Sequence, residues 1–267
     1  SLISKKLQNR NPTGCPVCVL FREIHNKHDQ TELHKNLDYI YKWCNKWGMI
    51  VNTEKTVSMC ITRKKYPLHH AYSLGSSTLK QVNNYKYLGV TFTTNLSWNS
   101  HIENICASAF RKLCFLRHKL RNSPPSVKLL CYQSYIRPKL EYACVVWDSY
   151  TKCNIDKLER IQRKAVRFIY SKFRHTDSPS ELMSANNIPL LQSRRRQLRL
   201  DFLSSLLNHR VAIDPSLYLT PLSTRYTRHH QPNSFTPYFA RTDTYKFSFF
   251  PRTVSEWNTL SECDRLA

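Results

Sequence analysis

Apolar residues recur at helical spacing near the start of the chain, and a different spacing follows. Between His28 and Trp47 they return every three or four residues, which predicts an amphipathic helix ending at Gly48. From residue 49 to residue 92 apolar and polar positions alternate as they do in strands, with Gly75 at an expected hairpin turn. The first hundred residues therefore predict one helix followed by a small antiparallel sheet.

Beyond Trp98 the apolar period becomes helical and stays so. We expect helices over about residues 100–120, from Ser123-Pro124 to a kink or end at Pro138, over 155–170 and over 191–207. From Asp214 onward prolines, serines, threonines and aromatic residues replace the periodic leucines, which predicts an irregular tail with short ordered pieces near 247–250 and Trp257. The predicted fold class is α+β, with a mixed part, an all-helical part and an irregular C-terminal tail.

The chain is strongly basic. Its 267 residues include 41 Lys and Arg against 18 Asp and Glu, a formal net charge of +23, and residues 101–200 alone hold 20 basic and 7 acidic side chains. Such an excess favours a polyanionic partner, so nucleic acid is expected rather than a membrane. Because no apolar run is long enough to span a membrane and residues 1–20 lack a signal-peptide core, the expected location is intracellular, in nucleus or cytoplasm, and not secreted.

The ten cysteines are scattered among apolar positions, as small core residues are, so reduced thiols are expected. Cys15 and Cys18 form the only C-x-x-C motif, and no second such pair completes a tetrahedral zinc site. His25 and His28 are the only nearby alternative ligands, and chance accounts for their spacing. No metal site is predicted.

Basic side chains line one face of the predicted helix over residues 155–170. They recur at steps of three and four residues, about 5 Å between neighbours, which suits the phosphates along a strand. We expect this face to bind nucleic acid, the alternative being an ordinary solvated surface, and we interpret the arginines at positions 194–196 and 199 in the same way. The residues of the face are Lys157, Arg160, Arg163, Lys164 and Arg167.

Several segments carry motifs in a recognisable order. They are Val19-Leu20-Phe21, residues 37–47 ending in W-C-x-x-W, Gly48-Met49-Ile50-Val51-Asn52-Thr53-Glu54-Lys55-Thr56, Tyr87-Leu88-Gly89-Val90, and the stretches 137–148, 157–167 and 249–258. Together they resemble, in sequence and in order, the C-terminal part of a reverse transcriptase from a non-LTR retrotransposon of the Jockey-like and related group. The resemblance extends from about residue 18 to about residue 260.

The resemblance implies a domain organisation. It indicates the remnant of a polymerase palm over residues 18–97, a helical thumb-like domain over 98–210 and an irregular C-terminal extension over 211–267, with residues 1–17 unmatched. Intact relatives synthesise DNA on an RNA template with Mg²⁺ and deoxynucleotides, so an RNA/DNA template–primer is the implied partner. The oligomeric state is not predicted.

Site residues follow from the same resemblance. Lys55 would lie near the incoming triphosphate as a vestigial catalytic residue, and the Tyr87, Leu88 and Gly89 turn would bind the primer strand. The residues alone favour the alternative that Lys55 is an ordinary solvated lysine at the start of a strand. Gly89 is equally a strand glycine that relieves crowding.

Two adjacent aspartates hold the catalytic Mg²⁺ in such polymerases, because this hard ion needs carboxylate oxygens. At the corresponding place this chain reads Gly14-Cys15-Pro16-Val17-Cys18-Val19, and the only acid before residue 29 is Glu23. We therefore expect a fragment truncated before the aspartate pair, without a cofactor of its own and inactive by itself. The alternatives are a non-catalytic nucleic-acid-binding module and a decayed transposon reading frame with no function.

Overall fold

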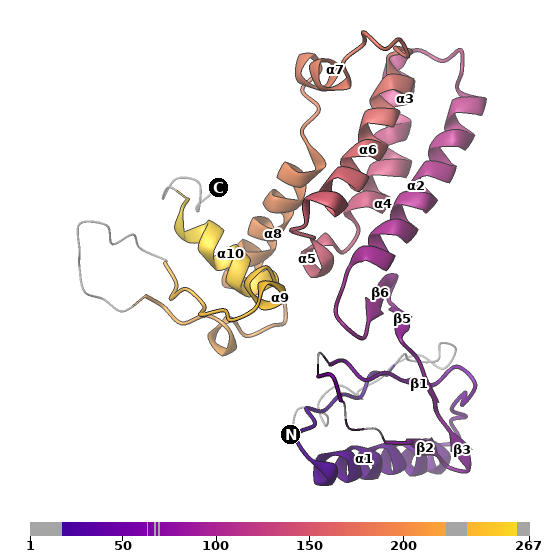
Figure 1. Cartoon of the computed structure of the whole chain (residues 1–267), viewed down its shortest axis with the longest axis vertical. Helices are drawn as coiled ribbons and strands as arrows, with labels where there is room; N and C mark the ends of the chain where they lie inside the picture. Colours follow the sequence, from indigo (N-terminus) through magenta and orange to yellow (C-terminus); the bar gives the residue numbers. More distant parts are fainter. Residues whose placement is uncertain (1–17, 63, 67, 69, 223–233, 261–267) are drawn as a thin grey trace. The chain divides into compact units, whose positions relative to one another are not determined.

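The computed structural model describes residues 18–62, 64–66, 68, 70–222 and 234–260 (Figure 1). Helices with short two-stranded sheets make up this part of the chain, so the predicted α+β class is confirmed. The chain divides into two compact units, Ser1–Asn83 and Asn84–Ala267, and each is described by itself. The unmatched segment 1–17, with Cys15, lies outside the described residues.

The first unit contains the predicted amphipathic helix, α1 (Lys27–Lys46). Its N-terminus is closed by a capping box in which Asn26 Oδ1 accepts from the Asp29 backbone N–H at 2.9 Å and the Asp29 carboxylate accepts from the Asn26 N–H. The predicted hairpin at Gly75 is confirmed: β2 (Ser73–Leu74) and β3 (Ser77–Thr78) pair antiparallel around it. Gly75 has φ +61°, and a Cβ there would stand 2.8 Å from the Tyr41 ring, so only glycine fits.

The small antiparallel sheet predicted over residues 49–92 is confirmed only in part, because the strands form separate two-stranded sheets and one of the pairs is parallel. β1 (Val57–Ser58) pairs parallel with β4 (Lys80–Gln81), and residues 49–51, expected as a strand, form none. A parallel pair needs a long connection between its strands, and the segment from residue 59 to residue 79 supplies it. Alternation of apolar and polar residues indicates extended chain but not its direction of pairing, so the parallel arrangement has no signature in the pattern.

The second unit begins with the hairpin of β5 (Asn84–Tyr87) and β6 (Val90–Thr93), which is followed by helices. Helices α2 (Asn99–Lys119), α3 (Pro125–Cys131) and α6 (Lys152–Ile169) pack side by side around an apolar core (Figure 1). This core includes Ile102, Leu113, Leu158 and Ile169. The unit division falls at 83/84, whereas the palm and thumb regions divide at 97/98 by resemblance, and the latter division stays a prediction. The first helices of this unit are α2 (Asn99–Lys119), α3 (Pro125–Cys131), α4 (Arg137–Glu141), α5 (Cys144–Trp147), α6 (Lys152–Ile169), α7 (Pro179–Ala185) and α8 (Leu191–Leu207).

Pro138 does not end the helix in which it lies. A π-helical turn, η2 (Tyr132–Ile136), joins α3 to α4, and the Arg137 N–H donates to the Tyr132 carbonyl. Proline lacks an N–H and its ring clashes with the carbonyl four residues earlier in an α-helix. The wider turn just before Pro138 gives that ring room, so the helical path continues.

Order is confirmed where short ordered pieces of the tail were predicted, near residues 247–250 and Trp257, but the ordered element is longer and covers residues 249–258. They form α10 (Phe249–Asn258), whose Val254 and Trp257 are buried against Leu203 and Leu206 of α8. The helical spacing of these apolar residues is present in the sequence, but the surrounding prolines and serines obscure it. The shorter elements between α8 and α10 are η3 (Pro215–Leu217) and α9 (Asp243–Lys246).

Two cysteines behave as the small core residues expected from their positions. Cys144 is buried and Cys106 is half-buried within the α2–α6 core. Burial raises the pKa of each thiol to about 11. Both side chains are therefore protonated, weakly reactive thiols at neutral pH.

His101 fixes the β5–β6 hairpin to the helices. Its ring is 2% exposed and packs edge-on against Trp147 with ring centres 5.1 Å apart. Its Nδ1 accepts a hydrogen bond from the Thr91 backbone N–H at 3.2 Å, which requires this nitrogen to be unprotonated. Burial, with a smaller contribution from Lys86, lowers the pKa of His101.

Acidification is expected to destabilise the second unit through this histidine. Below about pH 6.5 His101 binds a proton in the unfolded chain but not in the folded one. The free energy of unfolding therefore falls as pH falls, by up to about 1.4 kcal/mol per pH unit. Urea unfolding followed by circular dichroism between pH 7.5 and pH 5 measures this. The His101→Gln variant is expected to be less stable at pH 7.5 but to lose less stability on acidification; an equal loss in both proteins would contradict the assignment.

Candidate nucleic-acid interface

The Tyr87–Val90 motif forms the tip of the β5–β6 hairpin. Because Tyr87 pairs with Val90, the loop contains only Leu88 and Gly89, with φ of +45° and +87° as a type I′ turn requires. Glycine adopts this conformation without strain, but leucine rarely does. Leu88 is 65% exposed, so a strained residue presents an apolar side chain to solvent at the end of the hairpin.

Tyr142, at the end of α4, supports this turn. Its hydroxyl donates to the Leu88 carbonyl at 3.2 Å, and a Cβ on Gly89 would lie 3.1 Å from the Tyr142 ring. The turn therefore needs glycine both for its conformation and for this close contact. Sequence reasoning did not single out Tyr142 as a site residue, because the two partners are 54 residues apart and no local pattern links them.

Three of the five basic residues expected to bind nucleic acid on α6 already have partners. Lys157 Nζ lies 2.7 Å from Glu103 Oε1 of α2, a hydrogen bond that raises the pKa of Lys157. Lys164 Nζ lies 4.3 Å from the centre of the Phe110 ring. Arg167 donates to the backbone carbonyls of Arg174 and Asp177 at 3.3 and 3.1 Å. These side chains hold neighbouring segments in place.

Arg160 and Arg163 differ from those three. Both side chains are exposed, and neither takes part in an ion pair within the described part of the chain. The acid beside them, Glu159, is buried and accepts from the Gln192 backbone N–H at 2.9 Å, and burial raises its pKa. Glu159 thus faces the interior, and the two guanidinium groups, three residues apart on one helix face, are available to an external anion.

The nucleic-acid interpretation is wrong for the two buried arginines of α8, Arg195 and Arg199. Arg194 bonds Glu141 at 3.1 Å, Arg195 bonds Asp148 at 2.7 Å, and Arg196 lies 3.5 Å from Glu256. Arg199 is 1% exposed and bonds both Asp148 and Glu256. Their acidic partners are 47 or more residues away in sequence, so the spacing along α8 could not reveal them. We call the group formed by the buried Asp148, Arg195 and Arg199 with the partly buried Arg252 and Glu256 the Asp148 cluster.

Lys55 lies in the first unit. Its side chain is exposed, and its backbone N–H donates to Asn52 Oδ1 at 3.0 Å. The Thr56 hydroxyl donates to the Asn52 backbone carbonyl at 2.8 Å. Residues 52–56 therefore form a tight turn that is closed by hydrogen bonds to the side chain and to the backbone of Asn52. Hydrogen bonds to Asn52 thus connect the asparagine, the lysine and the threonine of the motif, and the Lys55 side chain lies on the outside of the turn.

The described residues do not fit a Mg²⁺ centre of the kind that polymerases use. No group of three or more His, Cys, Asp or Glu side chains in the described part of the chain is placed to hold a metal ion. Two Mg²⁺ ions need several carboxylates together, whereas the buried carboxylate of Asp148 faces three arginines.

None of the described helices combines the length and the apolar character needed to cross a membrane.

Comparison with curated proteins finds relatives among mobile elements. Over 157 residues the chain is 26% identical to the probable RNA-directed DNA polymerase from transposon X-element of Drosophila melanogaster, covering 57% of this chain and 17% of that protein. It is 26% identical over 141 residues to the corresponding protein from transposon BS, with 51% and 16% covered. To the RNA-directed DNA polymerase from mobile element jockey, also of Drosophila melanogaster, it is 27% identical over 141 residues, with 51% and 15% covered.

These matches confirm, over about half of the chain, the resemblance predicted from its motifs. The matched part spans only 15–17% of these relatives' own length. No family model matches the chain. No solved structure matches it either.

Proposed function

We propose that this chain, a homologue of the RNA-directed DNA polymerases of non-LTR retrotransposons, is a part of such an enzyme that holds the template–primer duplex. The observation that carries the proposal is the pair of exposed arginines on α6, Arg160 and Arg163, which have no ion-pair partner among the described residues. They occur in a homologous chain with a net charge of +23.

The mode of binding follows from these side chains. Two guanidinium groups on one helix face can each donate two hydrogen bonds to a phosphate. Such contacts release counterions and do not depend on base sequence, as suits a surface that must follow a moving duplex. The neighbours Lys157, Lys164 and Arg167 keep α6 against α2 and the 174–177 loop, and they add positive potential around the pair.

We assign to each region of the chain the role of the corresponding region in the homologous polymerases. In this proposal residues 18–97 are palm and 98–210 are thumb, and the Tyr87, Leu88 and Gly89 turn contacts the primer strand with the exposed Leu88 side chain. Lys55 is the vestige of a residue that faces the triphosphate. The described residues have no carboxylate group suited to Mg²⁺, so the chain alone binds nucleic acid without extending a primer.

Binding and primer extension with the full chain test the proposal. A fluorescently labelled RNA–DNA hybrid titrated at about 100 mM salt should bind with a dissociation constant of about 10 μM or tighter, as sequence-independent complexes do. With Mg²⁺, deoxynucleotides and an RNA template, the same preparation should leave the primer at its original length. Absence of binding at about 100 μM chain overturns the binding role, and primer extension above a buffer control overturns the claim of inactivity.

A further inference from the structure

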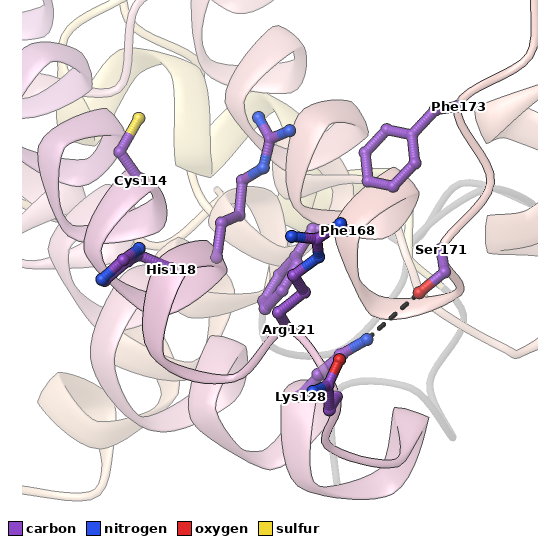
Figure 2. Close-up of a pocket in the computed structure, with 9 residues that line it drawn as sticks. Cys114, His118, Arg121, Lys128, Phe168, Ser171 and Phe173 are labelled. Carbon is purple, nitrogen blue, oxygen red and sulfur yellow. Dashed lines mark hydrogen bonds between the residues drawn. The ribbon is translucent and has the colours of Figure 1, made fainter.

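A second basic feature lies where the end of α2, the start of α3 and the end of α6 meet. These segments border an open cavity of about 650 Å³ (Figure 2). Arg117, His118 and Arg121 line it from α2 and the turn that follows, Lys128 lines it from α3, and Phe168 and Phe173 line it from α6 and beyond. The volume falls in the range of about 300–1,000 Å³ that small-ligand sites occupy.

The charge of this cavity is of one sign. Three of its lining residues are arginine or lysine, His118 lies beside them, and none of the described residues that line it is acidic. The same unit provides carboxylates for its other buried cations: Arg195 and Arg199 both bond Asp148. The cavity thus lacks the counter-charge that the Asp148 cluster has.

Lys128 shows this lack most clearly. It is 4% exposed, and its Nζ donates to Ser171 Oγ at 3.1 Å and lies 5.3 Å from the centre of the Phe168 ring (Figure 2). No ion pair found within the described ranges includes it. A buried ammonium group without a carboxylate is costly, and its two remaining N–H donors need acceptors. An anion in the cavity supplies both the charge and the acceptors.

The edge of the cavity adds an aromatic surface. Phe173 is 54% exposed, and the Arg117 guanidinium carbon lies 5.3 Å from the centre of its ring. An exposed ring beside cationic side chains is the arrangement on which proteins stack the bases of single strands. Bases within a duplex are already stacked and paired, so this ring can serve only an unpaired base.

We propose that this cavity binds one phosphate of a single-stranded nucleic-acid segment, with Lys128 and Arg121 bonding its oxygens and Phe173 stacking on the adjacent base. The site rests on the proposed function and extends it: the α6 pair binds the duplex, and this cavity takes the unpaired strand that continues from it. It therefore distinguishes a hybrid with a single-stranded extension from a blunt one.

Binding of two hybrids to the full chain tests the site. One hybrid is blunt, and the other carries the same duplex with an extension of about six nucleotides, within the site sizes of single-strand binders. The unaltered chain should bind the extended hybrid about tenfold more tightly, which lies within the range of about 5- to 160-fold that one stacked base is worth. The double variant Arg121→Gln/Lys128→Met should lose this preference and bind the blunt hybrid within about threefold of the unaltered chain.

Two further variants serve as controls. Arg210→Gln/Arg241→Gln removes the same charge from exposed positions in the same unit and should keep the preference for the extended hybrid. Phe173→Ala changes only an exposed side chain, so it should reduce the preference without unfolding the chain, whatever Lys128→Met does to stability. Retention of the tenfold preference in both the Phe173→Ala and the Arg121→Gln/Lys128→Met variants would overturn the site.

Cys114 provides an independent readout, because it is exposed and lines the cavity. The extended hybrid should slow its alkylation by iodoacetamide by at least about threefold, measured by mass spectrometry. The blunt hybrid, which has no unpaired strand to enter the cavity, should leave the alkylation of Cys114 unchanged. Unchanged Cys114 alkylation with bound extended hybrid overturns the site alone, whereas failure to bind either hybrid overturns the proposed function and the site with it.

Discussion

Replacement of Asp148 by alanine is expected to destabilise the second unit by about 3–5 kcal/mol, the usual cost of removing one partner from a buried ion pair. Asp148 is 8% exposed, and its carboxylate accepts hydrogen bonds from Arg195 at 2.7 Å and from Arg199 and lies 3.2 Å from Nη1 of Arg252. Burial lowers the pKa of all three arginines, so the fold already bears a cost for holding them. Without the carboxylate, three guanidinium groups face one another, with Glu256 beside Arg199 and Arg252 and the more distant Glu159 acting on Arg195.

Chemical unfolding followed by circular dichroism measures this loss. Asp156→Ala is the matched control, because Asp156 is an exposed aspartate on α6 and its removal should change stability by less than about 0.5 kcal/mol. Asp148→Asn keeps an acceptor but no charge and should fall between the two. Equal stability of the Asp148→Ala and Asp156→Ala variants would show that the cluster does not hold α8 and α10 together.

Charge reversal of the α6 pair, Arg160→Glu/Arg163→Glu, is expected to weaken binding of an RNA–DNA hybrid by about tenfold or more at 100 mM salt. Both residues are exposed and have no ion-pair partner within the described part of the chain, so the change disturbs no internal ion pair there. Removal of one phosphate-binding side chain makes the slope of log K against log salt concentration shallower by about one. The slope should therefore become shallower by about two, and affinity should fall on every sequence alike.

The matched control is Arg210→Glu/Arg241→Glu, which makes the same change of net charge at exposed positions of the same unit. If the effect were only one of total charge, both variants would lose the same affinity. A fall of less than about threefold in the α6 variant, or an equal fall in the control, contradicts a specific role for this helix face.

Helices were predictable where apolar residues recur every three or four positions, because this spacing indicates a buried helix face. The helices over residues 28–47, 155–170 and 191–207 were expected, and α1, α6 and α8 occupy those places. The turn at Gly75 was also predictable, because its glycine is needed locally. Periodicity did not predict the parallel pairing of β1 with β4, since alternation does not encode strand direction.

Which basic side chains are ion-paired and which are exposed was not predictable, because the acidic partners are distant in sequence. The arginines of α8 have the spacing of a binding surface, but Glu141, Asp148 and Glu256 lie beside them in the fold. On α6 the same pattern contains two kinds of residue, of which Arg160 and Arg163 are the exposed ones without ion-pair partners among the described residues. The basic cavity, whose lining runs from Cys114 to Phe173, has no local motif at all.

The salt dependence of hybrid binding by the unaltered chain tests the central claim most directly. If the chain holds a template–primer through phosphate contacts on α6 and its surroundings, log K plotted against log salt concentration between about 50 and 300 mM should be linear, with a slope of about −3 or steeper. Primer length and base sequence should change it little. Binding that is absent, or whose slope is flatter than about −1, would contradict the account.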